Sequence, residues 1–113
     1  MRDRTKAFSI AIVRFVSELP NDRINSVLSR QLLRSGTSVG ANYRSASYAK
    51  SPADMIAKLK LVEEEADESA YWLELIESTA VGTTPVTRDL KAEATEIFRI
   101  ASASVKTLRQ AKQ

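Results

Sequence analysis

The 113-residue sequence contains no cysteine and no histidine, and it has only three glycines and three prolines. Without cysteine the chain forms no disulfide, which is typical of proteins in a reducing cytoplasm. Without histidine it lacks the commonest general base and the commonest metal ligand of enzymes. These two absences argue against a hydrolase, a redox enzyme or a metalloenzyme, and we expect no cofactor. The scarcity of glycine and proline predicts few loops.

Long apolar runs are also missing, and none approaches the length of a membrane span. The first residues lead into a helical pattern that Arg14 interrupts, unlike the unbroken apolar core of a secretory signal peptide. We therefore expect a cytoplasmic protein with no membrane partner. The length suits one domain with one core, and we assign residues 1–113 to a single domain.

Charge is distributed unevenly along the chain, whose net charge is +3. Residues 51–80 carry eight acidic and two basic side chains, whereas residues 21–50 and 81–113 together carry eleven basic and four acidic ones. This alternation allows ion pairs within the molecule. It also leaves an excess of cations that suits partners rich in phosphate.

Apolar residues recur at helical spacing in four segments, and no segment alternates with the period of two that strands require. The first three segments span about 3–18, 23–49 and 52–78, and the fourth follows residue 85 and extends past 108. The breaks between them lie at residues 19–22, 50–54 and 80–85. Asn21 or Asp22 is expected to cap the second helix, and Ser51, followed by Pro52, the third. Short connections imply antiparallel neighbours, so the pattern predicts an all-α, antiparallel up-down-up-down four-helix bundle.

The residues expected to face the core follow from the same spacing. They are Phe8, Ala11, Ile12, Phe15 and Leu19; Ile24, Leu28, Leu32, Val39 and Ala46; Met55, Leu59, Val62, Ala66, Ser69, Leu73 and Ile76; and Leu90, Ala94, Ile97, Ala101, Ser104 and Leu108.

Two glycines, Gly36 and Gly40, lie one helical turn apart inside the second segment. A phosphate loop of the Walker type needs Lys and then Ser or Thr after its second glycine, but Ala41 and Asn42 follow here. Glycine inside a helix costs about 1 kcal/mol relative to alanine. The pair therefore indicates a continuous helix that another backbone approaches closely. That neighbour is either a helix of the same bundle or a second subunit.

A second stripe on the third segment lies beside its core face. Leu61, Trp72 and Leu75 are about 100° around the helix from the core positions, with Glu68 among them. One interpretation is a wide core face with a half-buried Trp72. The interpretation we favour is a protein–protein interface, in which tryptophan is enriched and Glu68 requires an arginine partner. The candidate self-association residues are Leu61, Glu68, Trp72, Leu75, Gly36 and Gly40.

Basic residues form stripes on the second and fourth segments, opposite the core positions. They are Arg23, Arg30, Arg34 and Arg44 on the second, and Arg88, Lys91, Arg99 and Lys106 on the fourth. Such stripes are usually solvated surface, and some should pair with Glu63, Glu64, Asp67 and Glu74 of the third. The excess of cations also fits sequence-independent contacts with nucleic-acid phosphates. No base-reading motif accompanies them.

Three stretches resemble a known family: 31–34 (QLLR), 38–44 (SVGANYR) and 68–73 (ESAYWL). They are similar to the four-helix-bundle family named for proteins encoded in intervening sequences of bacterial 23S ribosomal RNA genes. The resemblance extends from the region of Phe8 into the fourth segment. Ser45 stands where this family usually has glutamate, and Gly36 where alanine is more usual.

The resemblance implies a small bundle that assembles into a homopentameric ring, and it implies no family-wide biochemical activity. A related branch provides the accessory protein of reverse transcriptases in diversity-generating retroelements, where a basic pentamer engages the enzyme and its RNA.

The sequence thus supports three hypotheses, in decreasing order of preference. The first is a non-enzymatic, oligomeric four-helix bundle that binds RNA or a ribonucleoprotein partner, such as a reverse transcriptase, through basic helix surfaces. The second is a protein-interaction scaffold that binds no nucleic acid. The third is an enzyme with a di-metal site of helix carboxylates. Against this hypothesis, the sequence contains no histidine and so cannot form the Glu-x-x-His element of such bundles.

Overall fold

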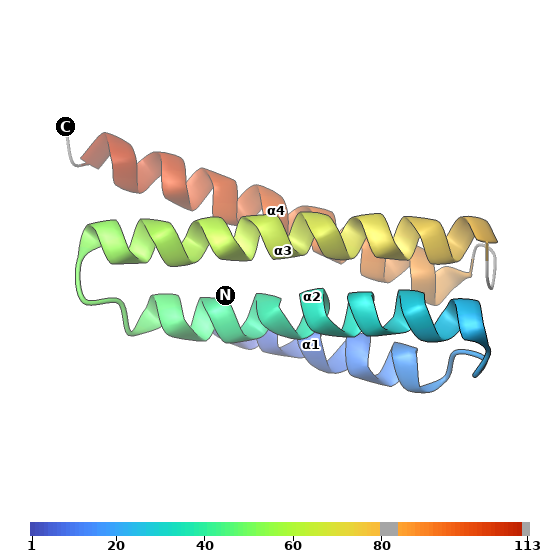
Figure 1. Cartoon of the computed structure of the whole chain (residues 1–113). Helices are drawn as coiled ribbons and strands as arrows, with labels where there is room; N and C mark the ends of the chain where they lie inside the picture. Colours follow the sequence, from blue (N-terminus) through green and yellow to red (C-terminus); the bar gives the residue numbers. More distant parts are fainter. Residues whose placement is uncertain (80–83, 112–113) are drawn as a thin grey trace.

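Four antiparallel helices make up the computed structural model, which describes residues 1–79 and 84–111. The helices are α1 (Arg2–Ser17), α2 (Arg23–Ser47), α3 (Pro52–Thr79) and α4 (Pro85–Ala111). They run up, down, up and down, and each packs against its neighbours in the chain (Figure 1). The prediction of an all-α four-helix bundle is therefore confirmed. Most of the predicted break at 80–85 lies outside the described residues.

Side-chain caps fix the helix starts close to the positions that the sequence predicts. Asp22 accepts a hydrogen bond from the backbone N–H of Asn25 at 2.8 Å at the start of α2. Ser51 accepts one from the N–H of Asp54 at 3.0 Å at the start of α3. The Thr84 hydroxyl accepts one from the N–H of Thr87 at 3.1 Å as α4 begins. Each cap satisfies a backbone donor that has no partner within the helix.

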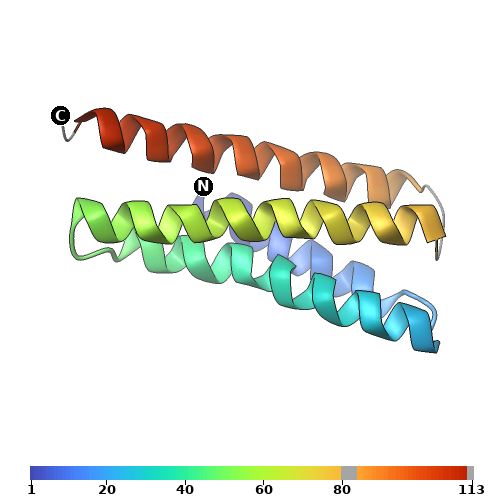
Figure 2. The same ribbon diagram turned by 45° about the horizontal axis from the view of Figure 1, so that its top comes forward.

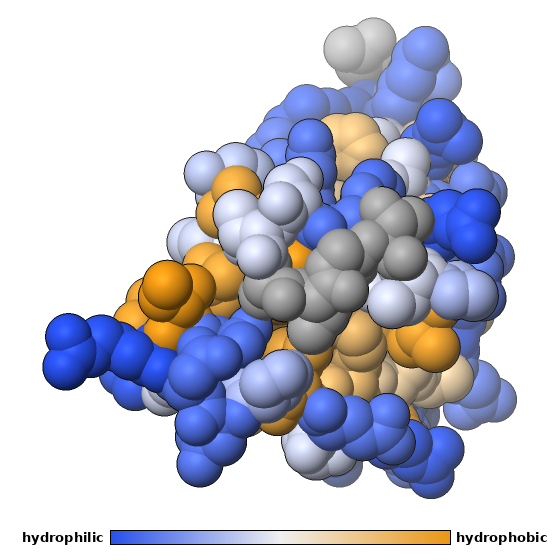
Figure 3. Space-filling model, turned by 90° about the vertical axis from the view of Figure 1, so that its right-hand side faces the viewer, coloured by the Kyte–Doolittle hydropathy of each residue, from blue (hydrophilic) through white to orange (hydrophobic). Residues whose placement is uncertain are grey.

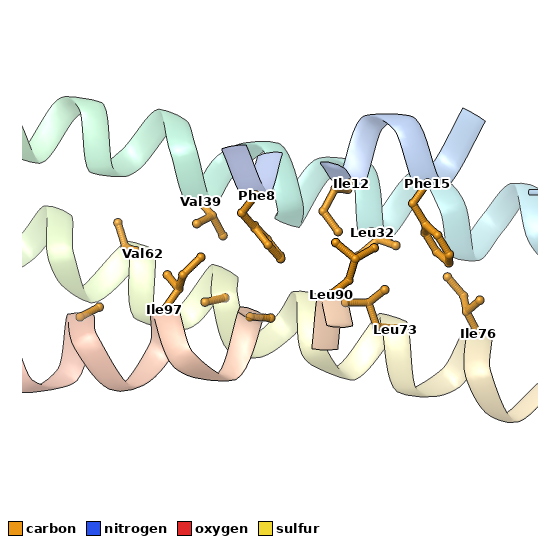
Figure 4. Close-up of a cluster of buried hydrophobic side chains, with 13 residues drawn as sticks. Phe8, Ile12, Phe15, Leu32, Val39, Val62, Leu73, Ile76, Leu90 and Ile97 are labelled. Carbon is orange, nitrogen blue, oxygen red and sulfur yellow. The ribbon is translucent and has the colours of Figure 1, made fainter. Parts of the chain in front are cut away.

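The core lies along the axis between the α1/α2 pair and the α3/α4 pair (Figure 4). Side chains from all four helices point toward one another there, among them Phe8, Ile12, Leu32, Leu73 and Ile97. On α3, six of the seven predicted core positions are buried, and only Met55 remains partly exposed. The regular spacing of apolar residues on α3 therefore predicted its buried face correctly.

On α2 the predicted core residues Leu32, Val39 and Ala46 are buried and Leu28 is partly buried, but one predicted position is wrong. Ile24 was expected in the core, but 65% of its surface is exposed, and the next residue, Asn25, is buried instead. Gly36 is buried as well. Asn25 lies seven residues before Leu32 and therefore shares its face, whereas Ile24 lies about 80° around the helix from Leu32.

The helix α1 begins part-way along the bundle, short of the α2–α3 connection and of the last turns of α4 (Figures 1 and 2). Near its start, α1 is joined to α4 by an ion pair between Arg4 and Glu93. Beyond this point α4 carries Ser104 and Leu108, which were predicted in the core. They are only partly buried, and Val105 is buried instead, in a cluster with Leu59 of α3 and Ala46 of α2. The predicted positions face the space that α1 does not reach.

A groove of about 460 Å³ occupies that space between α2, α3 and α4. It is lined by Tyr43, Met55, Leu59, Ile100, Ala103, Ser104, Thr107 and Leu108. A small second cluster of buried residues, Ala46, Leu59 and Val105, lies at this end. The bundle therefore has four helices over part of its length and three at the end near the α2–α3 connection.

Candidate nucleic-acid and self-association surfaces

The two glycines of α2 lie inside a continuous helix with α1 close against them, as predicted. A Cβ atom added to Gly36 would lie 2.6 Å from Cγ2 of Ile12, and one added to Gly40 would lie 2.7 Å from Oγ of Ser9. The Ser9 hydroxyl donates a hydrogen bond to the carbonyl of Gly36 at 2.8 Å and accepts one from the N–H of Gly40 at 3.1 Å. The close neighbour of the glycines is thus a helix of the same chain.

The acidic residues of the second stripe face α2, where Arg34 pairs with both Glu65 and Glu68. The side chain of Glu65 is only 20% exposed. Burial raises the pKa of Glu65, and the positive charge of Arg34 opposes this shift. Below this ion pair a hydrogen bond of 3.0 Å joins the buried hydroxyls of Ser35 and Ser69. The arginine partner expected for Glu68 is therefore present within the chain.

The apolar residues of the second stripe lie along the same flank of α3. Leu61 is 41% exposed, whereas Trp72 and Leu75 are partly buried. Trp72 packs against the core cluster and meets the ring of Tyr71 edge-on, with 5.2 Å between the ring centroids. Its indole N–H is buried without a hydrogen-bond partner among the described residues. Trp72 therefore serves the core of its own bundle and also borders the surface.

Two residues of α2 extend this surface, and the sequence did not single them out for it. Val27 precedes Arg34 by seven residues, and Leu75 follows Glu68 by seven, so both lie two turns beyond the ion pair in the same direction. Ile24 lies one further turn along. Val27 is 54% exposed.

We call this surface the α2/α3 strip, and it consists of Ile24, Val27 and Arg34 with Leu61, Glu65, Glu68, Trp72 and Leu75. Hydrophobic residues reach the surface at the end where α2 begins and α3 ends (Figure 3). The sequence placed Ile24 in the core. For that reason it did not predict that the apolar surface continues onto α2.

The eight candidate cations divide into paired and unpaired ones. Arg34 contacts Glu65 and Glu68, Lys91 lies 3.0 Å from Glu77, and Arg99 lies 3.6 Å from Glu96. Within the described residues, the other five have no carboxylate within ion-pair distance: Arg23, Arg30, Arg44, Arg88 and Lys106. All five are exposed.

The acids that pair with these cations differ from those predicted. The sequence assigned Glu63, Glu64, Asp67 and Glu74 of α3 to this role. In the described residues, the α3 acids that pair with arginine or lysine of other helices are Glu65, Glu68 and Glu77. These three lie on the flanks of α3, within reach of α2 or α4, whereas an acid on the outward face has no helix opposite.

The two basic stripes lie on opposite sides of the bundle. In the described structure the backbone of α2 lies close to α1 and α3, that of α4 lies close to α3 and to a lesser extent to α1, and the backbones of α2 and α4 do not approach each other closely. These two helices are therefore diagonal. Because both turn their buried faces to one core, their exposed cations point away from each other. A straight nucleic-acid segment cannot contact both stripes of one bundle together.

The relationship of the chain to known proteins follows from its sequence as well as its fold. A profile of the 23S rRNA-intervening sequence protein family matches residues 1–103. The chain belongs to this family. The resemblance carried by the stretches around Gly40 and Trp72 is thereby confirmed.

A solved structure with the same fold extends over nearly the whole length of this intervening-sequence protein. It is a crystal structure of a protein of unknown function from the S23 ribosomal protein family of Bacteroides thetaiotaomicron. The two share 39% identity and superpose with a TM-score of 0.85, over 93% of this chain and 97% of the other. Among curated proteins none matches.

Two further features of this intervening-sequence protein concern metals and membranes. Among residues 1–79 and 84–111, no three Asp, Glu, His or Cys side chains gather in a way that could hold a metal ion. None of the described helices is long and apolar enough to cross a membrane.

Proposed function

We propose that this family member is a non-enzymatic, self-associating four-helix bundle that binds RNA or a ribonucleoprotein partner through its basic surface. The observation that carries the proposal is a set of exposed cations that have no carboxylate partner within residues 1–79 and 84–111: Arg23, Arg30, Arg44, Arg88 and Lys106. Exposed cations of this kind are available to phosphate groups. Contacts with phosphates supply affinity for nucleic acid without reading the base sequence.

Self-association is proposed through the α2/α3 strip. Exposed Ile24 and Val27 lie, by helical register, at the same end of the strip as the partly buried Trp72 and Leu75, and an apolar surface of this kind is typical of interaction sites. The Arg34 ion pair lies within the strip and provides polar groups that a second copy can contact. The family resemblance favours five copies in a closed ring, in which each strip meets a different surface of the next copy.

The RNA-binding proposal is tested by fluorescence anisotropy with labelled RNAs of unrelated sequence. We expect the affinity to fall steeply between about 50 and 200 mM salt and to vary little with sequence. A double charge reversal, Arg23→Glu with Arg30→Glu, should weaken binding while thermal unfolding stays cooperative. Arg34 is left unchanged because its ion pairs contribute to the fold. No binding at low salt, or binding that salt leaves unchanged, would contradict the proposal.

The self-association proposal is tested by light scattering at micromolar concentration. We expect the wild-type protein to be a cyclic oligomer and Val27→Glu to be a smaller species, because a charge within an apolar contact is costly to bury. Val86→Glu is the matched control: Val86 is 55% exposed, close to the 54% of Val27, but lies outside the strip at the start of α4. A monomeric wild-type protein would refute the proposal.

A protein-interaction scaffold without nucleic acid is the second candidate, and the ion pairs of Arg34, Lys91 and Arg99 favour it. These cations already pair with carboxylates of the same chain. The scaffold hypothesis gives the charged residues this role, in which they stabilise the bundle and its protein contacts and bind no phosphate. Purification from the host with and without nuclease separates the two candidates. RNA that copurifies supports the first, and a protein partner that remains after nuclease treatment supports the second.

A further inference from the structure

A groove runs along the outer side of the contact between α1 and α2. Its volume is about 590 Å³, and it is lined by Arg2, Asp3, Lys6, Ser9, Thr37, Gly40, Ala41 and Arg44. The groove forms because both helices carry small or polar residues at this contact: Ser9 on α1, and Thr37, Gly40 and Ala41 on α2. The same glycine that lets α1 approach therefore also deepens the groove beside it.

Positive charge dominates this groove. It contains three cations, Arg2, Lys6 and Arg44, and one acid, Asp3. No carboxylate of the described residues lies within ion-pair distance of the three cations. The sequence did not group them, because Arg2 and Lys6 are about forty positions from Arg44 and only the packing of α1 on α2 brings them together.

One of these cations is held in place by the protein itself. The Arg2 guanidinium donates a hydrogen bond of 3.0 Å to the Tyr48 hydroxyl and lies 5.3 Å from the centre of its ring. This contact uses no negative charge, so the guanidinium keeps its full attraction for an anion. The hydroxyls of Ser9 and Thr37 donate to backbone carbonyls of α2, so the groove offers mainly cations to a ligand.

A further cation lies along the same side of the contact between α1 and α2. Arg30 lines a second hollow, together with Val16, Ser17 and Leu33. Arg30 and Arg44 are separated by about 21 Å along α2, since each residue adds about 1.5 Å. Cations spaced over this distance suit a chain of phosphates, whereas a single small anion would use only one of the two hollows.

We propose that the groove between α1 and α2 binds the phosphodiester backbone of RNA, with Arg2, Lys6 and Arg44 at one end and Arg30 at the other. This inference rests on the proposed function and assigns RNA to one side of the bundle. The diagonal stripe of α4, with Arg88 and Lys106, then lies on the side away from the bound backbone.

The test compares two equivalent substitutions, Ala41→Glu in the groove and Ala92→Glu on α4. Both alanines are exposed within helices, and Ala92 lies one turn from Arg88. Each variant gains one negative charge one helical turn from an arginine, Arg44 for Ala41 and Arg88 for Ala92, at a helical position that tolerates glutamate. In anisotropy titrations with labelled RNA at about 50 mM salt, we expect Ala41→Glu to weaken binding about tenfold or more and Ala92→Glu less than about twofold.

A second pair, Lys6→Gln and Lys106→Gln, keeps the test decisive if a glutamate disturbs the helix. Loss of one phosphate contact should make the plot of log affinity against log salt concentration shallower, with a slope smaller in magnitude by about 1. We expect that reduction for Lys6→Gln and no reduction for Lys106→Gln. If wild-type protein binds RNA but the α4 variants lose as much as the groove variants, the groove assignment is wrong. If wild-type protein binds no RNA, the proposed function itself fails.

Discussion

The part of the bundle that α1 covers and the part beyond its first residue enclose their apolar side chains to different degrees. In the covered part, the larger buried cluster draws residues from all four helices, among them Phe8, Leu32, Leu73 and Ile97. Beyond it, a smaller cluster consists of Ala46, Leu59 and Val105 from three helices, with an open groove beside it. The same helices α2, α3 and α4 thus pass through two environments.

The difference shows what helical spacing does and does not specify. On α4, Ser104 and Leu108 continue the face that Leu90, Ala94 and Ile97 use in the core. No part of α1 reaches this end, so they line the groove. Spacing therefore specifies which face of a helix is apolar, and the lengths of the neighbouring helices decide where that face is buried.

The largest expected difference comes from removing a leucine in each part. Leu73→Ala should destabilise the protein by about 4 kcal/mol, because its neighbours on four helices cannot close the cavity. Leu59→Ala should cost about 2 kcal/mol, since water and the flexible Met55 side chain can enter from the groove. Chemical denaturation of both variants measures the two values. A larger loss for Leu59→Ala would overturn the comparison.

A smaller loss is expected where α1 meets α2. The methyl group of Gly36→Ala would contact the fully buried Ile12, so we expect a net loss of about 1–3 kcal/mol, even though alanine favours helix by about 1 kcal/mol. The double variant with Ile12→Ala makes room for the methyl group. Its loss should be smaller than the sum of the two single losses. Additive losses would show that the two side chains do not interfere.

The sequence predicted features that depend on one helix at a time. The caps at Asp22 and Ser51 and the buried face of α3 follow from local spacing, and all were correct. Features that depend on how two helices align were missed. Examples are the pairing of Lys91 with Glu77 and the groove formed by Arg2 with Arg44. The register between helices is set by packing, which no single helical pattern contains.

The smallest expected effects concern pH, and their signs differ between the two parts. Burial raises the pKa of Glu65 in the covered part, so its ionisation in the folded state is unfavourable. Its contribution to stability is greatest below its unfolded pKa and falls as the pH rises through the folded value. Glu65→Gln should therefore gain stability relative to wild type between about pH 4 and pH 7, by less than about 1 kcal/mol.

The opposite sign is expected for Asp54, near the α2–α3 connection. The backbone N–H of Lys50 donates to its carboxylate and lowers its pKa. The stability that this contact gives is present above the unfolded pKa and is lost as the pH falls through the folded value. Asp54→Asn should therefore lose stability relative to wild type as the pH rises from about 3 to 6. Thermal unfolding between about pH 3 and pH 7 tests both variants. If both gained or both lost stability relative to wild type as the pH rises, the opposite pKa shifts of Glu65 and Asp54 would be contradicted.

The hydroxyl of Ser9 also determines how α1 is aligned along α2. It bonds the carbonyl of Gly36 and the N–H of Gly40, the acceptor and donor that close one turn of α2. A side chain on α1 can approach that backbone only where no Cβ intervenes. After a slip of one turn, this hydroxyl would lie opposite the side chain of Leu33 or Tyr43 and would lose both of its partners. One serine opposite two glycines thus selects a single alignment among several that hydrophobic contact alone would tolerate.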